Sequence, residues 1–172
     1  MSGAPLVVVP DLGDERVRLR PWRPTDVDAL VAAWADPAVI AGSSPPADRS
    51  PTAARRWIDG WDERRRAGVA MDLVIADPDD DRVLGEVGVA DIDSERRAAL
   101  VGWWVAGPER GRGVATAGVG RFTDWAVDGP FSALLARIAG DNHASLVVAE
   151  RCGYQLLRPA TDHEPSVWAR RA

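Results

Sequence analysis

The feature that most constrains this fold is a glycine-rich segment between an apolar stretch and a helical pattern. The sequence from Val105 to Thr116 reads VAGPERGRGVAT, and it follows the apolar run 98–105. N–H groups at the start of a helix lack partners within that helix, so with the helix dipole they form a site for anions. Glycines let a phosphate approach the backbone closely, and Arg110 and Arg112 carry charge that suits phosphate oxygens. We therefore expect a phosphate-binding loop here; a simple glycine turn is the alternative.

Two common phosphate-binding motifs do not fit this loop. All 21 basic residues are arginine, whereas the Walker A loop of P-loop NTPases contains a lysine. The dinucleotide fingerprint G-x-G-x-x-G is met only by Gly111 and Gly113, because Thr116 fills the third glycine position. That fingerprint also follows the first strand of its domain, and here several expected strands precede the loop. A nucleotide-binding domain for NAD or ATP is therefore a weak alternative.

Length and composition favour a single metal-free domain. The 172 residues suit one domain, and no apolar run approaches the length of about 18 residues that a membrane span requires. The cysteine Cys152 and the histidines His143 and His163 are the only residues of their kinds, which excludes a disulfide framework and a multi-cysteine or histidine-rich metal site. The first residues lack the pattern of a secretory signal. We expect a cytoplasmic protein that does not contact membranes.

The charge pattern argues against one class of partner. The net charge is −5, and the whole acidic excess lies in residues 1–86. A nucleic-acid surface would require a basic face, so nucleic-acid binding is not expected. An acidic first half could attract cationic substrates by long-range steering, but solubility explains the same pattern equally well.

Hydrophobic periodicity predicts a mixed α/β domain over residues 16–172, preceded by a lead-in over residues 1–15. Leu6–Val9 is a candidate edge strand within that lead-in. Strands are expected over 16–22, 69–76, 82–92, 98–105, 131–139, from 153 and over 164–170. Helices are expected between 25 and 37 and over 52–67, 114–128 and 142–152. Three consecutive strands before the glycine loop indicate one mixed sheet flanked by helices.

At this point several segments together resemble one family. The segment Arg110–Ala115 (RGRGVA) resembles the Q/R-x-x-G-x-G/A pyrophosphate loop of the GNAT acyl-CoA N-acetyltransferases. Asn142–Ser145 (NHAS) and Glu150–Tyr154 (ERCGY) are similar to the second segment of the same family, N-x-x-S with E-K/R-x-G-F/Y. Further segments resemble the branch that contains the ribosomal-protein-alanine N-acetyltransferases: Arg18–Trp22 (RLRPW), Asp28–Leu30 (DAL), Leu84–Gly88 (LGEVG) and Gly102–Val105 (GWWV). The resemblance covers about residues 15–170 in the expected order.

The resemblance implies a fold, a cosubstrate and a set of binding residues. It implies the GNAT fold, with a mixed central sheet of six or seven strands and about four helices, and acetyl-CoA as the acyl donor. The pyrophosphate would be held by the loop and helix start: Arg110, Gly111, Arg112, Gly113, Val114, Ala115 and Thr116. Trp104, Val105 and Ala106 would bind the pantetheine arm, and Asn142 and Ser145 would also contact CoA. The Val105 amide would stabilise the oxyanion formed at the thioester carbonyl.

The acid that protonates the leaving thiolate departs from the common family pattern. Many members place a tyrosine where this chain has Ala149. The only tyrosine, Tyr154, is expected to pack in the following strand. The resembling branch often uses the serine of N-x-x-S, so Ser145 is the candidate acid.

The general base is less clearly marked. Leu100 stands where that branch often carries a glutamate. Glu86 is a weak candidate base, as are Asp91 and Asp93, and a solvent-facing strand position is the simpler interpretation of each. An α-amine, with a reference pKa of about 7.7–8, needs little help from a base, whereas the pKa of lysine is about 10.4. The weak base signal therefore favours an α-amine acceptor.

These features lead to an N-acetyltransferase that acts on a primary amine, preferably the N-terminus of a protein or peptide. Trp103 is a candidate residue for the acceptor groove, since Trp103 and Trp104 face opposite sides of one strand and one of them could line it. Trp34 is a second candidate, because the resemblance places it in the region that usually shapes substrate entry. One alternative acceptor is a small cationic amine such as an aminoglycoside or a polyamine. A second alternative is a non-catalytic acyl-CoA-binding module. Either a monomer or a homodimer is compatible with the sequence.

Overall fold

A computed structural model describes residues 9–172. The strands are β1 (Leu12–Gly13), β2 (Arg18–Arg20), β3 (Met71–Ala76), β4 (Val83–Asp93), β5 (Ala98–Val105), β6 (Ala133–Ile138), β7 (Gln155–Arg158) and β8 (Ser166–Arg171). The α-helices are α1 (Val27–Ala35), α2 (Pro37–Gly42), α3 (Pro51–Asp59), α4 (Trp61–Arg66), α5 (Val114–Asp128) and α6 (His143–Arg151). Two short 3₁₀ helices, Pro24–Asp26 and Gly107–Glu109, precede α1 and α5.

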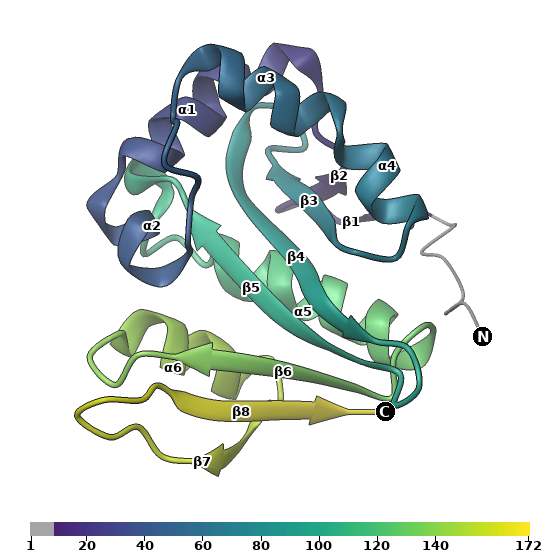
Figure 1. The fold of residues 1–172 in the computed structure, drawn as a ribbon, viewed down its shortest axis with the longest axis vertical. Helices are drawn as coiled ribbons and strands as arrows, with labels where there is room; N and C mark the ends of the chain where they lie inside the picture. Colours follow the sequence, from purple (N-terminus) through teal and green to yellow (C-terminus); the bar gives the residue numbers. More distant parts are fainter. Residues whose placement is uncertain (1–8) are drawn as a thin grey trace.

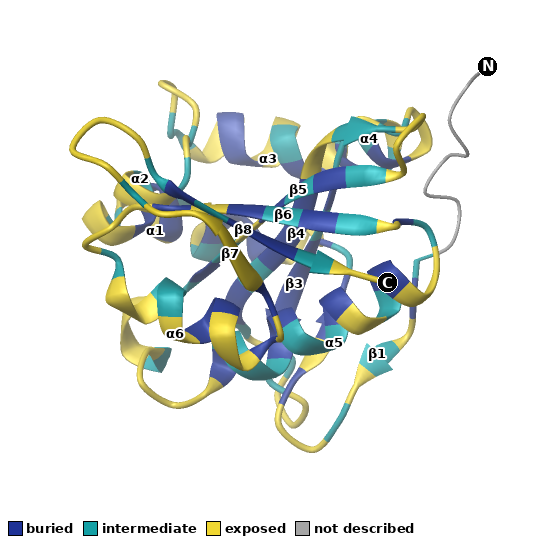
Figure 2. Ribbon diagram, turned by 90° about the horizontal axis from the view of Figure 1, so that it is seen from below, coloured by how far each residue is buried: buried dark blue, intermediate teal, exposed yellow. Residues whose placement is uncertain are grey.

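The described strands form one eight-stranded mixed sheet, in the order β1-β2-β3-β4-β5-β6-β8-β7. Every neighbouring pair is antiparallel except β5 and β6, which are parallel. Helices α1–α4 lie on one side of the sheet and α5 and α6 on the other (Figure 2). The mixed sheet with flanking helices confirms the expected α/β class, with slightly more strands than expected.

The sheet opens between its two parallel strands. β5 pairs with β6 only where Ala98–Leu100 face Ala133–Leu135. Beyond Leu100, β5 continues along β4, and β6 continues along β8, so the two strands diverge (Figure 1). The C-terminal part of β5 therefore has a sheet neighbour on one side only.

The main core lies between the sheet and α5. Side chains that alternate along β3 and β4, such as Leu73, Ile75 and Val87, are fully buried. Gly118 of α5 allows the close approach, because a Cβ atom there would lie 2.6 Å from the side chain of Ile75. This packing fixes the start of α5 relative to the end of β5.

Three local features differ from the sequence-based expectations. The helix expected over 52–67 is two helices, because α3 ends at Gly60 and α4 turns to lie against β3. The outermost strand on that side is Leu12–Gly13, whereas Leu6–Val9 was expected: Leu6–Val8 lie outside the described residues and Val9 is not in a strand. Within the described part of the chain, no helix has both the length and the hydrophobicity to cross a membrane.

Candidate active site

The glycine loop has the backbone geometry that a phosphate site requires. Gly111 and Gly113 adopt positive φ angles of 75° and 80°, and Gly113 is the N-cap of α5. No atom would obstruct a Cβ at either glycine within 4 Å, so the space in front of the loop is open. The first backbone bond of α5 runs from Ala117 N to Gly113 O, which leaves the N–H groups of residues 114–116 without helical partners. A helix start with free N–H groups of this kind is a general site for anions.

The two arginines of the loop are engaged in other contacts. Arg110 donates from Nε to the Val105 carbonyl oxygen at 3.0 Å and from Nη2 to Asp36 at 2.7 Å. Arg112 pairs with Glu109 at 2.8 Å. Arg110 thus ties the loop to the end of β5 and to the start of α2, where Asp36 is the N-cap. The expected phosphate contacts would therefore come mainly from backbone amides.

The backbone of β5 points one N–H group toward the opening between β5 and β6. Ala106 N donates to Leu84 O of β4 at 2.9 Å. Because neighbouring residues of a strand direct their N–H groups to opposite sides, the Val105 N–H lies on the side away from β4. This is the position expected for the donor to an oxyanion.

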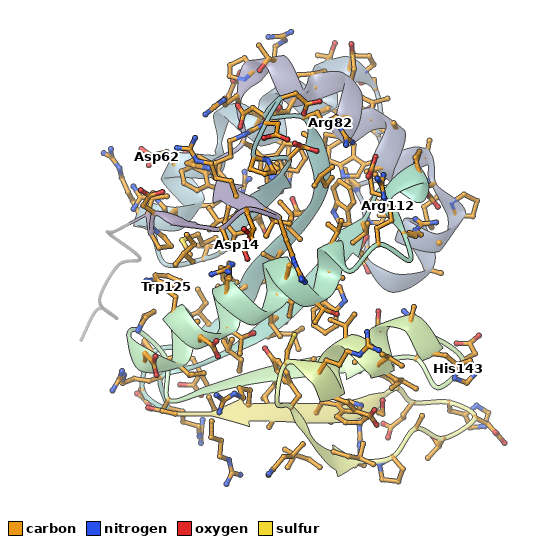
Figure 3. The ribbon with its side chains drawn as sticks, turned by 180° about the vertical axis from the view of Figure 1, so that it is seen from behind. Asp14, Asp62, Arg82, Arg112, Trp125 and His143 are labelled. Atoms are coloured by element: carbon orange, nitrogen blue, oxygen red, sulfur yellow. The ribbon has the colours of Figure 1, made fainter. Side chains whose placement is uncertain are left out.

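The N-terminus of α6 lies at the same end of the sheet. β5 and β6 are parallel, so their C-terminal ends share one edge, and α5 and α6 both begin beyond it. Figure 3 shows Arg112 and His143, beside these helix starts, at the same end of the molecule. Asn142 caps α6 by accepting a hydrogen bond from Ser145 N at 3.1 Å. Ser145 lies in the first turn of α6 and is partly buried.

Glu86 lies on the face of the sheet that helices α1–α4 cover. It pairs with Trp104 across β4 and β5, one residue before Val105. The Trp104 indole donates to Glu86 Oε1 at 3.0 Å, and the Trp22 indole donates to Oε2 at 2.8 Å. Both carboxylate oxygens are therefore held by N–H donors from different elements. A solvent-facing strand residue, the simpler expectation, does not describe this environment.

Two further charged side chains accompany Glu86. Burial and the negative charge of Asp72 raise the pKa of Glu86 to about 8, against the effect of the two indole bonds. Burial also raises the pKa of Asp72 to about 6, opposed by the charge of Arg64. The Arg64 guanidinium lies 4.4 Å from the Trp57 ring centre and donates to the Trp57 carbonyl oxygen.

The other candidate bases lie elsewhere. Asp93 pairs with Arg96 at 2.7 Å in the β4–β5 hairpin, and its pKa is lowered by hydrogen bonds to the Arg96 backbone and side chain. Asp91 is exposed near the same hairpin. Only Glu86 lies next to the C-terminal part of β5.

The two tryptophans expected in the acceptor groove lie on opposite sides of the central sheet. Trp34 is buried against Trp57, on the face of Glu86. Trp103 contacts Tyr154 on the other face, with ring centres 6.5 Å apart. Trp104, expected as a pantetheine contact, is the strand tryptophan that shares the face of Glu86.

Two reactive-looking side chains serve packing. Tyr154 is buried and hydrogen-bonded to the Thr123 hydroxyl at 2.9 Å, and burial raises its pKa. Burial raises the pKa of the Cys152 thiol to about 11, so it stays protonated. Among the described residues, no group of three or more His, Cys, Asp or Glu side chains is placed to hold a metal.

Sequence reasoning missed Asp72, Arg64 and Trp22 as neighbours of Glu86. One signal was present: Asp72 interrupts the apolar strand Met71–Ala76 at a position that faces Gly88. A charged residue inside a buried strand requires partners. The partners themselves come from separate parts of the chain, so their identity was not visible locally.

Comparisons with known proteins agree with this geometry. A family model described as an acetyltransferase (GNAT) domain matches residues 16–155. No curated protein sequence matches. The ribosomal-protein-S5-alanine acetyltransferase of Vibrio fischeri is structurally similar, with a TM-score of 0.81 and 16% identity over 95% of this chain and 97% of that chain. RimJ of Mycobacterium smegmatis, solved with CoA-disulfide, gives 0.78 and 22% identity over 93% and 86% of the two chains. An acetyltransferase from Agrobacterium tumefaciens strain C58 gives 0.76 and 25% identity over 96% of both.

Proposed function

Because this chain belongs to the GNAT acetyltransferase family and is an acetyl-CoA-dependent N-acetyltransferase, we propose that its acceptor is the N-terminal α-amine of a protein or peptide. The observation that carries this proposal is the carboxyl of Glu86, whose pKa is raised to about 8 beside the end of β5. A general base is most effective when its pKa lies near the pH at which the enzyme works. An α-amine, with a reference pKa of about 7.7–8, gives up its proton readily near neutral pH, whereas a lysine side chain, with a pKa of about 10.4, does not.

In this proposal each residue has one role in a direct transfer. The Glu86 carboxylate takes a proton from the acceptor ammonium group, and the neutral amine attacks the acetyl carbonyl carbon. The Val105 N–H donates to the carbonyl oxygen as negative charge develops on it. As the C–N bond forms, the attacking nitrogen gives up its second proton to solvent. As the C–S bond breaks, the Ser145 hydroxyl gives its proton to the departing thiolate and regains one from solvent, and Glu86 releases its proton before the next turnover.

We propose that acetyl-CoA binds at the exposed start of α5. The backbone amides of residues 111–116 would hold the pyrophosphate, which fits the unobstructed space before Gly111 and Gly113. The pantetheine arm would lie along the unpaired side of β5, at Trp104–Ala106. Asn142 would contribute to this site beside its role as the cap of α6. We include residues 16–172 in the catalytic domain, and we place the reaction in the cytoplasm.

The RimJ and Vibrio fischeri structures support the choice of acceptor only in that they share the fold of this chain. The latter is described as a ribosomal-protein-S5-alanine acetyltransferase. The identities of 16% and 22% do not carry a substrate from one protein to another. The acceptor therefore requires a direct measurement.

The test is thiol release from acetyl-CoA with paired acceptors. Each short peptide is supplied with a free N-terminus and with the same N-terminus already acetylated, and spermidine and kanamycin are run beside them. We expect turnover only with free N-termini. Turnover with spermidine or kanamycin alone would assign a small amine as acceptor. Acetyl-CoA binding without turnover on any amine would indicate a non-catalytic module.

Three variants test the assigned roles. Glu86→Gln should lower kcat by about 10²- to 10⁴-fold, the usual contribution of a general base. Ser145→Ala should also lower kcat, because the thiolate would then leave unprotonated. Tyr154→Phe is the control: its hydroxyl bonds Thr123 in the core, so kcat should stay unchanged. A large loss in Tyr154→Phe, with Ser145→Ala fully active, would reverse the assignment of the acid.

A further inference from the structure

Two tryptophans from distant parts of the sequence converge on one carboxyl group. Trp22 follows β2, and Trp104 lies in β5. Their indole N–H groups donate to different oxygens of Glu86, at 2.8 Å and 3.0 Å. A carboxylate with a single partner can rotate about its terminal torsion. Two donors on its two oxygens fix the plane of the group.

The ring of Trp22 is itself held rigidly. It is 5% exposed, its ring centre lies 5.8 Å from that of Trp57 in an edge-to-face contact, and it lies 6.3 Å from that of Trp104. Pro21 restricts the backbone just before it. Packing therefore fixes the position of the Trp22 N–H donor, and the Glu86 carboxylate adopts the orientation that accepts its hydrogen bond.

Two charged groups face Glu86, and both come from other elements: Asp72 from β3 and Arg64 from α4. The Asp72 carboxyl occupies the space over Gly88, where a Cβ atom would lie 2.5 Å from Asp72 Oδ1. β5 and the segment after β2 contribute no charge, only the two indole donors. Burial and Asp72 favour the protonated Glu86, whereas the indoles and Arg64 favour the carboxylate.

We propose that Trp22 is a positioning residue for acetyl transfer: with Trp104, it holds the Glu86 carboxylate in the orientation from which it accepts the acceptor's proton. This rests on the proposed role of Glu86 as the base. Trp22 touches neither substrate in this scheme and acts through Glu86 alone. Loss of its N–H donor should misalign the base. It should also destabilise the Glu86 carboxylate relative to the protonated carboxyl, which raises the pKa of Glu86.

The first test observes Glu86 without any acceptor. Nitrogen-15 indole spectra of the labelled full chain are recorded as pH is varied. The signals of Trp22 and Trp104, assigned with Trp22→Phe and Trp104→Phe, should shift with one common midpoint, and Glu86→Gln should abolish that shift. Trp22→Phe should move the midpoint of the Trp104 signal to higher pH, by roughly half a unit or more, because a donor to the carboxylate is lost. Asp72→Asn should move it to lower pH.

The matched control is Trp125→Phe. Trp125 is a partly buried tryptophan of α5 that packs on Phe122, on the other side of the sheet. The same change of side chain there should leave the midpoint in place. A general loosening of the fold would affect both variants, whereas removal of the N–H donor affects only Trp22→Phe.

The second test measures kinetics with a peptide acceptor that gives turnover. Trp22→Phe should lower kcat by roughly 10- to 100-fold, as expected for a misaligned catalytic group, with little change in KM for acetyl-CoA. The acidic limb of its kcat–pH profile should move to higher pH, as in the spectra. Trp125→Phe should change neither quantity.

The possible outcomes separate this inference from the function on which it rests. If the midpoint of the Trp104 signal does not move in Trp22→Phe, the inference is overturned. The role of Glu86 as the base is then still tested separately, by the kcat of Glu86→Gln. A moved midpoint with unchanged kcat shows that Trp22 tunes Glu86 without serving the reaction, which also overturns it. Full activity of Glu86→Gln removes the proposed base and the catalytic part of the inference together, even where the spectra behave as expected.

Discussion

The ionisation of Glu86 links the stability of the molecule to pH. Burial and Asp72 raise its pKa to about 8 in the folded state, compared with about 4.3 when unfolded. The folded state therefore holds this proton more tightly. The resulting stabilisation is fully present below about pH 4.3 and is lost as pH rises through about 8. We expect the free energy of unfolding to fall over this window, and Glu86→Gln to flatten that fall.

Urea unfolding at about pH 5.5 and about pH 8.5 checks this dependence. Asp93→Asn is the matched control, because Asp93 is partly exposed and its pKa is lowered by Arg96. Its contribution is lost only as pH falls through a value below the usual range of aspartate. It should therefore leave the window from 5.5 to 8.5 unchanged. An equal fall in wild type and Glu86→Gln would contradict the environment described for Glu86.

At the residue level, the expected packing of Tyr154 is confirmed: its side chain is buried, and its hydroxyl is hydrogen-bonded to Thr123 of α5. The setting of Glu86 was not predictable in this way. Its period-2 position in β4 is typical of an exposed strand residue, but Trp22, Arg64 and the covering helices come from earlier parts of the chain.

At the scale of elements, the start of α5 gives a prediction that separates backbone strain from binding. Gly113 has φ = 80° and Gly68 has φ = 66°, and neither has an atom within 4 Å of a Cβ position. Alanine in this conformation costs about 1–2 kcal/mol, so Gly113→Ala and Gly68→Ala should be destabilised similarly. Only Gly113→Ala should also weaken acetyl-CoA binding, by about tenfold or more, because the methyl group obstructs the phosphate approach.

Calorimetric titration with acetyl-CoA and urea unfolding measure the two effects separately. Gly68 lies in the turn between α4 and β3, away from the loop. Unchanged affinity in Gly113→Ala, at equal stability loss, would show that the phosphate does not approach the backbone at the start of α5.

A pair of glycines opposite each other in β4 and β5 gives a second prediction at this scale. A Cβ at Gly88 would lie 2.5 Å from Asp72 Oδ1 and 2.7 Å from the Met71 carbonyl oxygen, whereas nothing lies within 4 Å of a Cβ at Gly102. Gly88→Ala should lower the free energy of unfolding by roughly 1–3 kcal/mol, as overpacking does. Gly102→Ala should stay within about 0.5 kcal/mol. Equal effects by urea unfolding would argue against the tight contact of β3 with β4.

The elements themselves were largely predictable, because strong periodicity marks β3–β6, α5 and α6. The break of the expected helix 52–67 at Gly60 was not assigned, since a glycine within a helical pattern is often tolerated. β1 has only two residues, Leu12–Gly13, and its pairing with β2 leaves almost no pattern in the sequence.

At the scale of the whole molecule, the divergence of β5 and β6 is the feature that sequence could not supply. Ala98–Val105 is a continuous apolar strand, and nothing in it marks Leu100 as the last residue paired with β6. The divergence arises because β6 stays with β8 while β5 stays with β4. The family resemblance implied a site at this position, and the GNAT family model confirms the family.

Because the proposed binding at this opening involves both halves of the sheet, acetyl-CoA should stabilise the molecule as a whole. At a ligand concentration about 100 times Kd, the gain in stability is roughly 2.7 kcal/mol. For a chain of 172 residues, this corresponds to a rise in Tm on the order of 5–11 °C. Thermal unfolding is measured with acetyl-CoA, NAD and ATP in parallel at equal concentrations. Only acetyl-CoA should give the full shift, since the loop lacks a Walker lysine and the third glycine of a dinucleotide fingerprint. A larger shift with NAD or ATP would mean that the glycine loop serves a different nucleotide.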